Sequence, residues 1–264
     1  MSAVVLVVID GARPDALLQA RCPNVNRLHA NGASSWQALS VMPCLTLPCH
    51  TSIFYGVSPF RHGIFSNEWV PFAHPWPGLL EQMRAARLKA AFFYNWEPLR
   101  DLSRPGDLAC SYFRDNAQTP YGDQIIADEA ARFIADEQLD FAFVYFGTVD
   151  MAGHAFGWMS DEYLRQLERV DTALGTVLSS LNGHHTVVLQ SDHGGHDRNH
   201  GSNLPEDLVI PWIAAGPQIR RGYTIERDVS LLDTAPTIAR LLNLPVPERW
   251  EGLCLDEIFA GSKG

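Results

Sequence analysis

VVLVVIDG, residues 4–11, is the stretch of sequence that decides the fold of this chain. Its first six residues are all β-branched or leucine, and such an unbroken apolar run predicts a central strand buried on both faces of a parallel sheet. The run stops at Asp10, and Pro14 begins an expected helix that continues to about Ala30, where an Asn-Gly pair ends it. The chain is therefore expected to open with a strand, a turn that carries a carboxylate, and a helix.

The same alternation recurs along the rest of the chain. Strands are expected at residues 88–94, 141–146, 186–190 and 209–214, and helices from about 78 and at 123–137, 161–181 and 230–242. Strands that alternate with helices predict an α/β fold with a mostly parallel central sheet and helices on both faces. No repeat or clear linker divides residues 1–264, so we expect a single domain. Residues 69–77, rich in proline and aromatic residues, are expected to form a loop.

Composition excludes several classes of function. The 264 residues are 46% hydrophobic and carry a net charge of −10. The chain can bury a sizeable core, but it lacks the Lys/Arg cluster that stable nucleic-acid binding requires. No apolar run approaches the roughly 20 residues of a membrane helix, and the N-terminal run lacks the basic segment of a signal peptide. The five cysteines include no CxxC pair, which favours reduced thiols. We therefore expect a cytoplasmic protein with no membrane partner, of undetermined oligomeric state.

Carboxylates follow three of the expected strands. Asp10 and Asp192 come directly or almost directly after a strand, and Asp150 lies just past the strand at 141–146. In open α/β sheets, ligands bind outside the carboxyl ends of the strands. The three carboxylates therefore mark the edge of the sheet where a site is expected.

Histidines accompany two of these carboxylates. Asp150 and His154 are four residues apart, so either a helical turn or a tight loop containing Gly153 would bring them together; a surface turn without function is the alternative. Residues 191–201, SDHGGHDRNHG, hold three histidines and two aspartates among glycines, for which a solvated polar loop is the alternative. Imidazole and carboxylate are the ligands that zinc prefers in the absence of thiolates.

A threonine in residues 42–56 is the candidate nucleophile. Pro48 suits the start of a helix and Gly56 its end, so Thr46 is expected at or just before the helix N-terminus. Free backbone N–H groups at that position favour an anion such as phosphate. A simple capping role for Thr46 is the alternative.

Together these segments resemble the nucleotide pyrophosphatase/phosphodiesterase branch of the alkaline phosphatase superfamily. The resemblance rests on Asp10-Gly11-Ala12-Arg13-Pro14-Asp15, Thr46-Leu47-Pro48-Cys49-His50, Asp150-Met151-Ala152-Gly153-His154, Ser191-Asp192-His193-Gly194, His200-Gly201 and Asp233-Thr234-Ala235-Pro236-Thr237. These motifs occur in the family's order over nearly the whole chain, which makes them specific as a set. The resemblance implies an alkaline phosphatase-like fold in which the cap that shapes substrate choice is reduced or absent.

The resemblance also implies two divalent metal ions, zinc or, as the alternative, manganese. One ion would be held by Asp10, Thr46, Asp192 and His193, and the other by Asp150, His154 and His200. His196 remains an alternative to His200. Three carboxylates, three imidazoles and one hydroxyl are too many ligands for one tetrahedral ion, but they suit two.

The implied activity is hydrolysis of a small phosphate ester of the phosphodiesterase or nucleotide pyrophosphatase type. Thr46 would attack phosphorus and form a phosphothreonine intermediate, because a bound metal ion lowers the pKa of a hydroxyl. Asn67, where the family places an Asn that contacts phosphate, and the backbone N–H after Thr46 would bind the developing negative charge. Leu47 stands where nucleotide-hydrolysing members tend to carry an aromatic residue that stacks on a base. Stacking could instead come from Trp69, Trp76, Tyr94, Trp96 or Trp158.

Other functions stay open. A phosphomonoesterase or phosphonate hydrolase of the same superfamily would need a further cation or donor near the metals, for which Arg13, Arg61 and Arg198 are candidates. A non-catalytic metal-binding module on the same fold is less favoured, because Thr46 and all the implied ligands are present. A sulfatase is disfavoured, because the segment at residues 46–50 lacks the C/S-x-P-x-R pattern.

Overall fold

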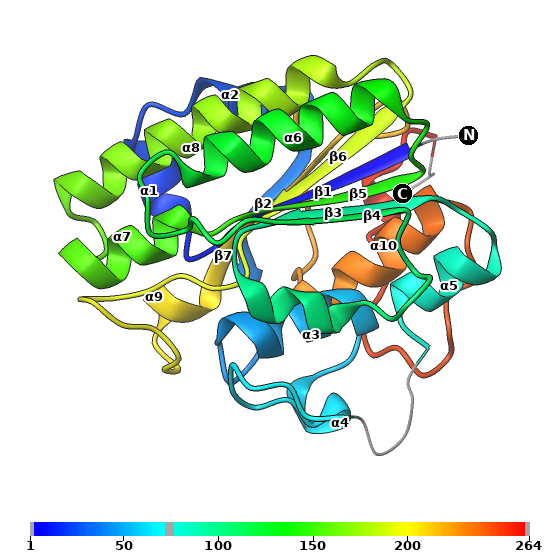
Figure 1. Cartoon of the computed structure of the whole chain (residues 1–264), viewed down its shortest axis with the longest axis horizontal. Coiled ribbons are helices and arrows are strands. Elements are labelled where there is room, and N and C mark those ends of the chain that lie inside the picture. Colours follow the sequence, from blue (N-terminus) through cyan, green and yellow to red (C-terminus); the bar gives the residue numbers. More distant parts are fainter. Residues whose placement is uncertain (1–2, 72–76, 262–264) are drawn as a thin grey trace.

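An eight-stranded sheet forms the centre of the computed structural model, which describes residues 3–71 and 77–261 (Figure 1). The strands follow one another across the sheet in the order β4-β3-β5-β1-β6-β7-β2-β8. Their bounds are β1 Ala3–Ile9, β2 Ala33–Leu39, β3 Ala90–Tyr94, β4 Cys110–Phe113, β5 Phe141–Phe146, β6 His185–Gln190, β7 Val209–Ala215 and β8 Tyr223–Thr224.

The first strand lies in the middle of the sheet, as the apolar run predicts. In its register with the neighbouring strands, Leu6 of β1 lies beside Phe143 of β5 and Val188 of β6, and both pairings are parallel. Strand β7 is antiparallel to both β6 and β2. The carboxyl ends of β5, β1 and β6 therefore lie side by side at one edge of the sheet.

Helices cover both faces of the sheet, which confirms the predicted fold class. In Figure 1, α1, α2, α6 and α8 lie on one face, and α3, α4, α5 and α10 lie on the other. Helices α7 and α9 lie at the end of the sheet to which β1, β5 and β6 point. The bounds are α1 Pro14–Gln19, α2 Pro23–Ala30, α3 Thr46–Tyr55, α4 Pro59–His62, α5 Leu79–Ala85, α6 Gly122–Asp136, α7 Thr148–Phe156, α8 Asp161–Ser180, α9 Pro205–Leu208 and α10 Thr234–Leu241. Short 3₁₀ turns cover Glu97–Leu102, Leu231–Asp233 and Asp256–Ile258.

Some predicted elements differ from the structure. The single helix expected from Pro14 to about Ala30 is wrong, because the backbone is extended at Ala20 and Pro23 starts a second helix. Strands β2, β4 and β8 were not predicted, since β2 reads ASSWQAL without apolar alternation and the other two are short. Within the expected loop at 69–77, the described residues belong to no helix or strand, and residues 72–76 lie outside the described part.

The sheet divides the core into two layers because side chains alternate along β1. Val4, Leu6 and Val8 face the layer under α3, α5 and α10, whereas the residues between them face α1, α2, α6 and α8. Phe143 of β5 is fully buried in the first layer. Its ring lies 4.9 Å from the ring of Phe92 and 5.2 Å from that of Phe54, measured between centroids. This layer joins the strands to α3, the helix that begins at Thr46.

A membrane-spanning helix does not occur among residues 3–71 and 77–261: none of their helices combines the necessary length with sufficient apolar character.

We predict that Phe143→Ala lowers the free energy of unfolding by about 3–5 kcal/mol, because it removes a buried ring and leaves a cavity. Urea denaturation followed by circular dichroism measures this loss. The control is Phe156→Ala, at a ring that is 55% exposed, which should change stability by less than about 0.5 kcal/mol. Equal effects of the two substitutions would contradict the assigned core.

Candidate functional site

Three buried carboxylates meet at the edge of the sheet where β5, β1 and β6 end. Asp10 follows β1 directly, Asp192 is the second residue after β6, and Asp150 lies in the first turn of α7 after β5. Each is at most 9% exposed. Gly11 allows the close approach of these turns: its φ is +70°, and a Cβ there would lie 3.2 Å from Asp150 Oδ1. The sequence thus brings together carboxylates that are up to 182 residues apart.

The first cluster of potential ligands consists of Asp10, Asp192 and His193, whose donor atoms all lie within 4.8 Å of one another. His193 Nε2 lies 3.2 Å from Asp10 Oδ1 and 3.4 Å from Asp192 Oδ2. Thr46 Oγ1 lies 3.4 Å from the same nitrogen. The hydroxyl of the expected nucleophile is therefore next to this cluster.

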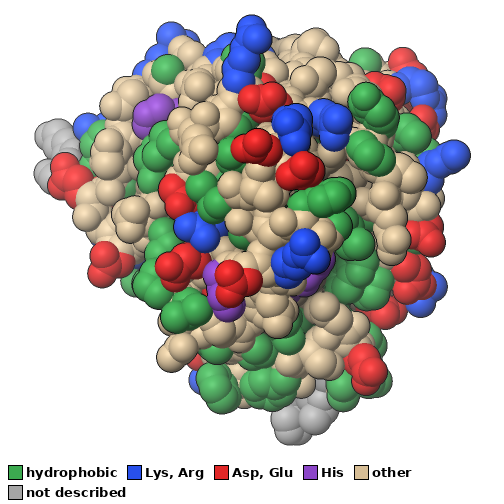
Figure 2. All heavy atoms as spheres, turned by 90° about the vertical axis from the view of Figure 1, so that its left-hand side faces the viewer, with side chains coloured by type: hydrophobic (Ala, Val, Ile, Leu, Met, Phe, Trp, Pro, Cys, Tyr) green, Lys and Arg blue, Asp and Glu red, His purple; other side chains and the backbone are tan. Residues whose placement is uncertain are grey.

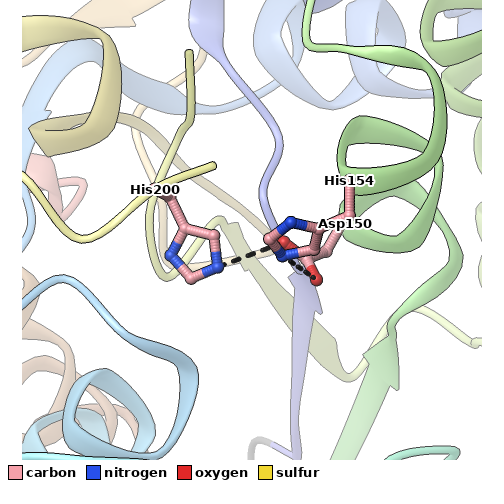
Figure 3. Close-up of side chains that lie close together, drawn as sticks. All are labelled: Asp150, His154 and His200. Atoms are coloured by element: carbon pink, nitrogen blue, oxygen red, sulfur yellow. Dashed lines mark ion pairs between the residues drawn. The ribbon is translucent and has the colours of Figure 1, made fainter. Parts of the chain in front are cut away.

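The second cluster consists of Asp150, His154 and His200, whose side chains point toward one another (Figure 3). His154 Nε2 lies 3.4 Å from Asp150 Oδ2, and His200 Nε2 lies 3.6 Å from Asp150 Oδ1. Asp150 and His154 converge because they are one turn apart on α7, so the helical turn, not the tight loop, joins them. The two clusters adjoin, since the rings of His193 and His200 are stacked with centroids 3.7 Å apart.

Backbone carbonyls orient all three histidines of the clusters. Nδ1 of His193 donates to Gly194 O at 2.8 Å, and Nδ1 of His154 donates to Arg198 O at 2.9 Å. Nδ1 of His200 donates to the carbonyl of Cys44 at 3.0 Å. A carbonyl oxygen only accepts, so each Nδ1 carries a proton, and Nε2 is the ring nitrogen that faces the carboxylates.

Burial keeps two of these rings in the neutral form that binds metals. It lowers the pKa of His193, and burial together with the neighbouring His193 lowers the pKa of His200 to about 3. His196 behaves differently. It bonds through Nδ1 to Asp207 Oδ1 at 2.7 Å, and this hydrogen bond raises its pKa. The structure therefore places His200, and not His196, with Asp150 and His154.

The donor atoms fit divalent cations. Within the described residues, Oδ1 of Asp10, Oδ1 of Asp150 and Oδ2 of Asp192 have no hydrogen-bond partner although they are buried. Burial, followed by the nearby charge of Asp10, raises the pKa of Asp150 and of Asp192 well above the usual range. Buried carboxylates are stabilised by pairing or by metal coordination. Two sets of carboxylate oxygens and imidazole Nε2 atoms match the ligands of zinc, and oxygen-rich sets also suit manganese.

Thr46 is the first residue of α3 and is buried beside the first cluster. Asn67 lies next to it, as expected, but its Oδ1 accepts a hydrogen bond from the backbone N–H of Leu47 at 3.0 Å. The two groups expected to bind phosphate therefore bind each other in this structure. A phosphate at Thr46 would have to replace the Asn67 oxygen as acceptor for that N–H.

Most of the aromatic residues considered for base stacking are buried or pack against the core. Leu47 is fully buried in the core, and Tyr94 is 2% exposed. Trp158 is buried behind the site, where its ring contacts His154 and its Nε1 donates to Gly11 O. Trp69 and Trp96 are partly buried and pack against the core, whereas Trp76 lies outside the described residues.

The three arginines considered as an additional cation for a monoester differ in their partners. Arg13 pairs with Asp15 and donates to the carbonyl of Gly195, and Arg61 lies 3.8 Å from Glu251. Arg198 is exposed, and its backbone carbonyl orients His154. Figure 2 views the side of the molecule that carries α7 and α9, where histidine side chains lie among acidic, basic and hydrophobic ones.

Sequence reasoning missed two residues, Tyr145 and His50, that form hydrogen bonds with residues of the site. The hydroxyl of Tyr145 donates to Asp10 Oδ2, and Nδ1 of His50 donates to the backbone carbonyl of Thr46 at 2.8 Å. Two signals could have found them. His50 is one helical turn after Thr46, and Tyr145 is a hydroxyl-bearing residue inside an otherwise apolar strand.

Comparisons with known proteins identify the family of the chain. A model of the type I phosphodiesterase / nucleotide pyrophosphatase family matches residues 4–209. The chain is 24% identical over 293 residues to GPI ethanolamine phosphate transferase 2 of Kluyveromyces lactis, covering 97% of this chain and 36% of the relative. It is 28% identical over 218 residues to human ectonucleotide pyrophosphatase/phosphodiesterase family member 1, covering 72% of this chain and 23% of the relative.

Among solved structures, an inactive variant of murine ectonucleotide pyrophosphatase / phosphodiesterase 5 in complex with AMP has the same fold. Its TM-score is 0.80 at 16% identity, with 98% of this chain and 100% of that chain covered. The present chain spans only about a quarter to a third of the length of the two curated relatives. Since the family model covers most of its residues, the chain belongs to the type I phosphodiesterase / nucleotide pyrophosphatase family, within the alkaline phosphatase superfamily.

Proposed function

We propose that this chain is a two-metal phosphoric ester hydrolase that acts on small phosphate esters, of the phosphodiesterase or nucleotide pyrophosphatase type. The observation that carries the proposal is the position of the Thr46 hydroxyl at a helix N-terminus, 3.4 Å from His193 Nε2 and beside buried carboxylates. A surface turn or a solvated loop would not bury these groups together. Membership of the family supports the same reading.

Two divalent cations, zinc or alternatively manganese, are part of the proposal. Asp10, Asp192, His193 and Thr46 would hold one ion, and the second cluster around Asp150 would hold the other. When bound, these cations would lower the pKa of a hydroxyl and neutralise charge on phosphate oxygens.

Thr46 would carry the covalent step. Its Oγ1 would form a bond to phosphorus while the bond from phosphorus to the leaving oxygen breaks, giving a phosphothreonine and a free alcohol or phosphate. Water would then hydrolyse the phosphothreonine and restore the hydroxyl. The N-terminus of α3 would stabilise the phosphate, because its backbone N–H groups and helix dipole favour an anion. Leu47 N–H would become one of these donors once Asn67 releases it.

A phosphomonoesterase or phosphonate hydrolase is the second candidate. The exposed Arg198 favours it, since no ion pair of this side chain occurs in the described part of the protein and its segment reaches the second cluster. A monoester carries one more negative charge than a diester and would use such a cation. A non-catalytic module is disfavoured, because the buried hydroxyl of Thr46 lies at a helix N-terminus 3.4 Å from His193 Nε2, a contact that binding of metal alone would not require.

The first prediction from this proposed function concerns the nucleophile. We expect Thr46→Ala to lower kcat by at least about 10³-fold, because a covalent nucleophile has no substitute in the site, while Thr46→Ser keeps measurable turnover. Steady-state kinetics with p-nitrophenyl esters measures both variants, and acid-quenched mass spectrometry detects the phosphothreonine. Thr46→Ala with full metal-dependent turnover would falsify the assignment.

The second prediction concerns the metals. The first cluster is buried, whereas the side chain of His154 in the second is 37% exposed. We therefore expect a chelator to remove two equivalents of metal in two phases, the faster from the second cluster, with loss of activity that zinc restores. The time course of metal release, monitored with a colorimetric metal-binding dye, tests this order. His154→Ala should abolish the fast phase. Full activity of metal-free protein would exclude the two-metal proposal.

The third prediction separates the two candidate reactions. We expect a higher kcat/KM for bis-p-nitrophenyl phosphate than for p-nitrophenyl phosphate. Arg198→Ala should leave the diester rate within about threefold, because a surface cation contributes little to a distant monoanion. A higher rate on the monoester that Arg198→Ala lowers would instead assign the chain as a phosphomonoesterase.

A further inference from the structure

The imidazole of His50 lies buried between the nucleophile and a proposed metal ligand. It is 0% exposed, and its Nδ1 lies 2.8 Å from the carbonyl oxygen of Thr46 and 3.6 Å from Asp192 Oδ2. Because the carbonyl can only accept, Nδ1 carries the proton. This N–H group therefore donates to the backbone carbonyl of Thr46, and the Asp192 carboxylate lies just outside hydrogen-bonding distance of the same nitrogen.

Tyr145 lies next to His50 and also contacts the first cluster. Its ring contacts the edge of the His50 ring, with centroids 5.3 Å apart and an angle of 70° between the planes. Its hydroxyl donates to Asp10 Oδ2. Tyr145 thus hydrogen-bonds to one carboxylate of the first cluster, Asp10, and the adjacent ring of His50 lies beside the other, Asp192. Phe143 supports the His50 ring from the strand below, with centroids 5.9 Å apart.

Stability alone does not explain an imidazole at this position. Among the described residues, His50 Nε2 has no hydrogen-bond partner although it is buried. A buried polar atom without a partner costs about 1–3 kcal/mol, whereas an apolar side chain of similar shape carries no such cost. The ring donates its hydrogen bond to the Thr46 carbonyl, and the Asp192 carboxylate lies 3.6 Å from the same nitrogen, so the polar edge of the imidazole is directed at the site.

We propose that His50 is a positioning residue that, with Tyr145, fixes the carboxylates of the first cluster and the first turn of α3. It would set the affinity of the cation position at Asp10, Asp192 and His193 and align the Thr46 hydroxyl with the phosphate. The inference rests on the proposed two-metal function. Groups that orient metal ligands in this way commonly contribute 10- to 100-fold to metal affinity or activity.

The test compares His50→Leu, which removes the donor, with His50→Asn, whose side-chain amide can place an N–H close to the position of Nδ1. We expect His50→Leu to bind one of two zinc equivalents about 10- to 100-fold more weakly and to lose kcat with little change in KM. His50→Asn should recover most of both. Competition with a chromophoric chelator, without substrate, measures zinc affinity, and the loss should persist in a His154→Ala background, which weakens the second position.

The matched control is His62→Leu. His62 is also buried, and burial also lowers its pKa to about 4, as it does for His50. Its Nε2 bonds to the hydroxyl of Ser52 at 3.1 Å, and its Nδ1 accepts from the backbone of Ile64. His62→Leu should leave zinc affinity and kcat unchanged. Equal losses in both leucine variants would show that the effect is structural and would overturn the proposal.

Tyr145→Phe keeps the inference testable even if His50→Leu does not fold. It retains the ring and removes only the hydroxyl, so it should weaken the same zinc equivalent as His50→Leu. The positioning role would be overturned if Tyr145→Phe and His50→Leu both kept wild-type zinc affinity and kcat. If His50→Leu is unfolded, wild-type values in Tyr145→Phe alone would overturn it. Either result would leave the two-metal proposal intact. A wild-type protein that binds no divalent ion would overturn both.

Discussion

The burial of three carboxylates at adjoining strand ends is the constraint on which the rest of this structure depends. Asp10, Asp150 and Asp192 lose their solvation by water, and in the described part of the protein the basic side chains within 4.0 Å of their carboxylates all belong to histidines. Burial lowers the pKa of His193 and of His200 and so favours their neutral form. These two rings therefore offer lone pairs to the site but no positive charge. Such an arrangement is stable when cations enter it, because unpaired buried charge is among the most expensive features a fold can contain.

The fold holds the buried carboxylates together by fixing the ends of the strands and helices that carry them. Helix α7, which carries Asp150 and His154, is anchored at its N-terminus by Asp123, whose carboxylate accepts from the backbone N–H groups of Gly147 and Thr148. Burial raises the pKa of Asp123 to about 6. On the other side of the sheet, the core around Phe143 holds α3 and therefore Thr46. The two halves of the site thus depend on different core layers.

Sequence patterns predicted the parts of the site that local chemistry specifies. The apolar run before Asp10 and the four-residue spacing of Asp150 and His154 each determine a position without tertiary information. The choice between His196 and His200 was different, because both lie in one polar segment and only the packing of Asp207 and Cys44 separates them. Likewise, the tyrosine in the apolar strand β5 signals a hydroxyl but not its partner, since the contact of Tyr145 with Asp10 joins neighbouring strands in register. The break in the helix expected from Pro14 was missed although Pro23 marks it, because a proline interrupts a continuous helix but suits the first turn of a new one.

Charge balance at the proposed two-metal site would favour a diester over a monoester. The two proposed divalent cations would bring four positive charges to three carboxylates, which would leave one positive charge while the Thr46 hydroxyl keeps its proton. A phosphodiester monoanion would neutralise this charge, whereas a monoester dianion would leave an excess negative charge in a buried place. Only a further cation could balance it, and the three candidates differ: Arg13 and Arg61 already lie beside carboxylates, which leaves Arg198 at the exposed side of the second cluster. Under the proposed function, substrate choice would therefore depend on whether one surface arginine reaches the phosphate, because the buried residues alone would suit a single negative charge.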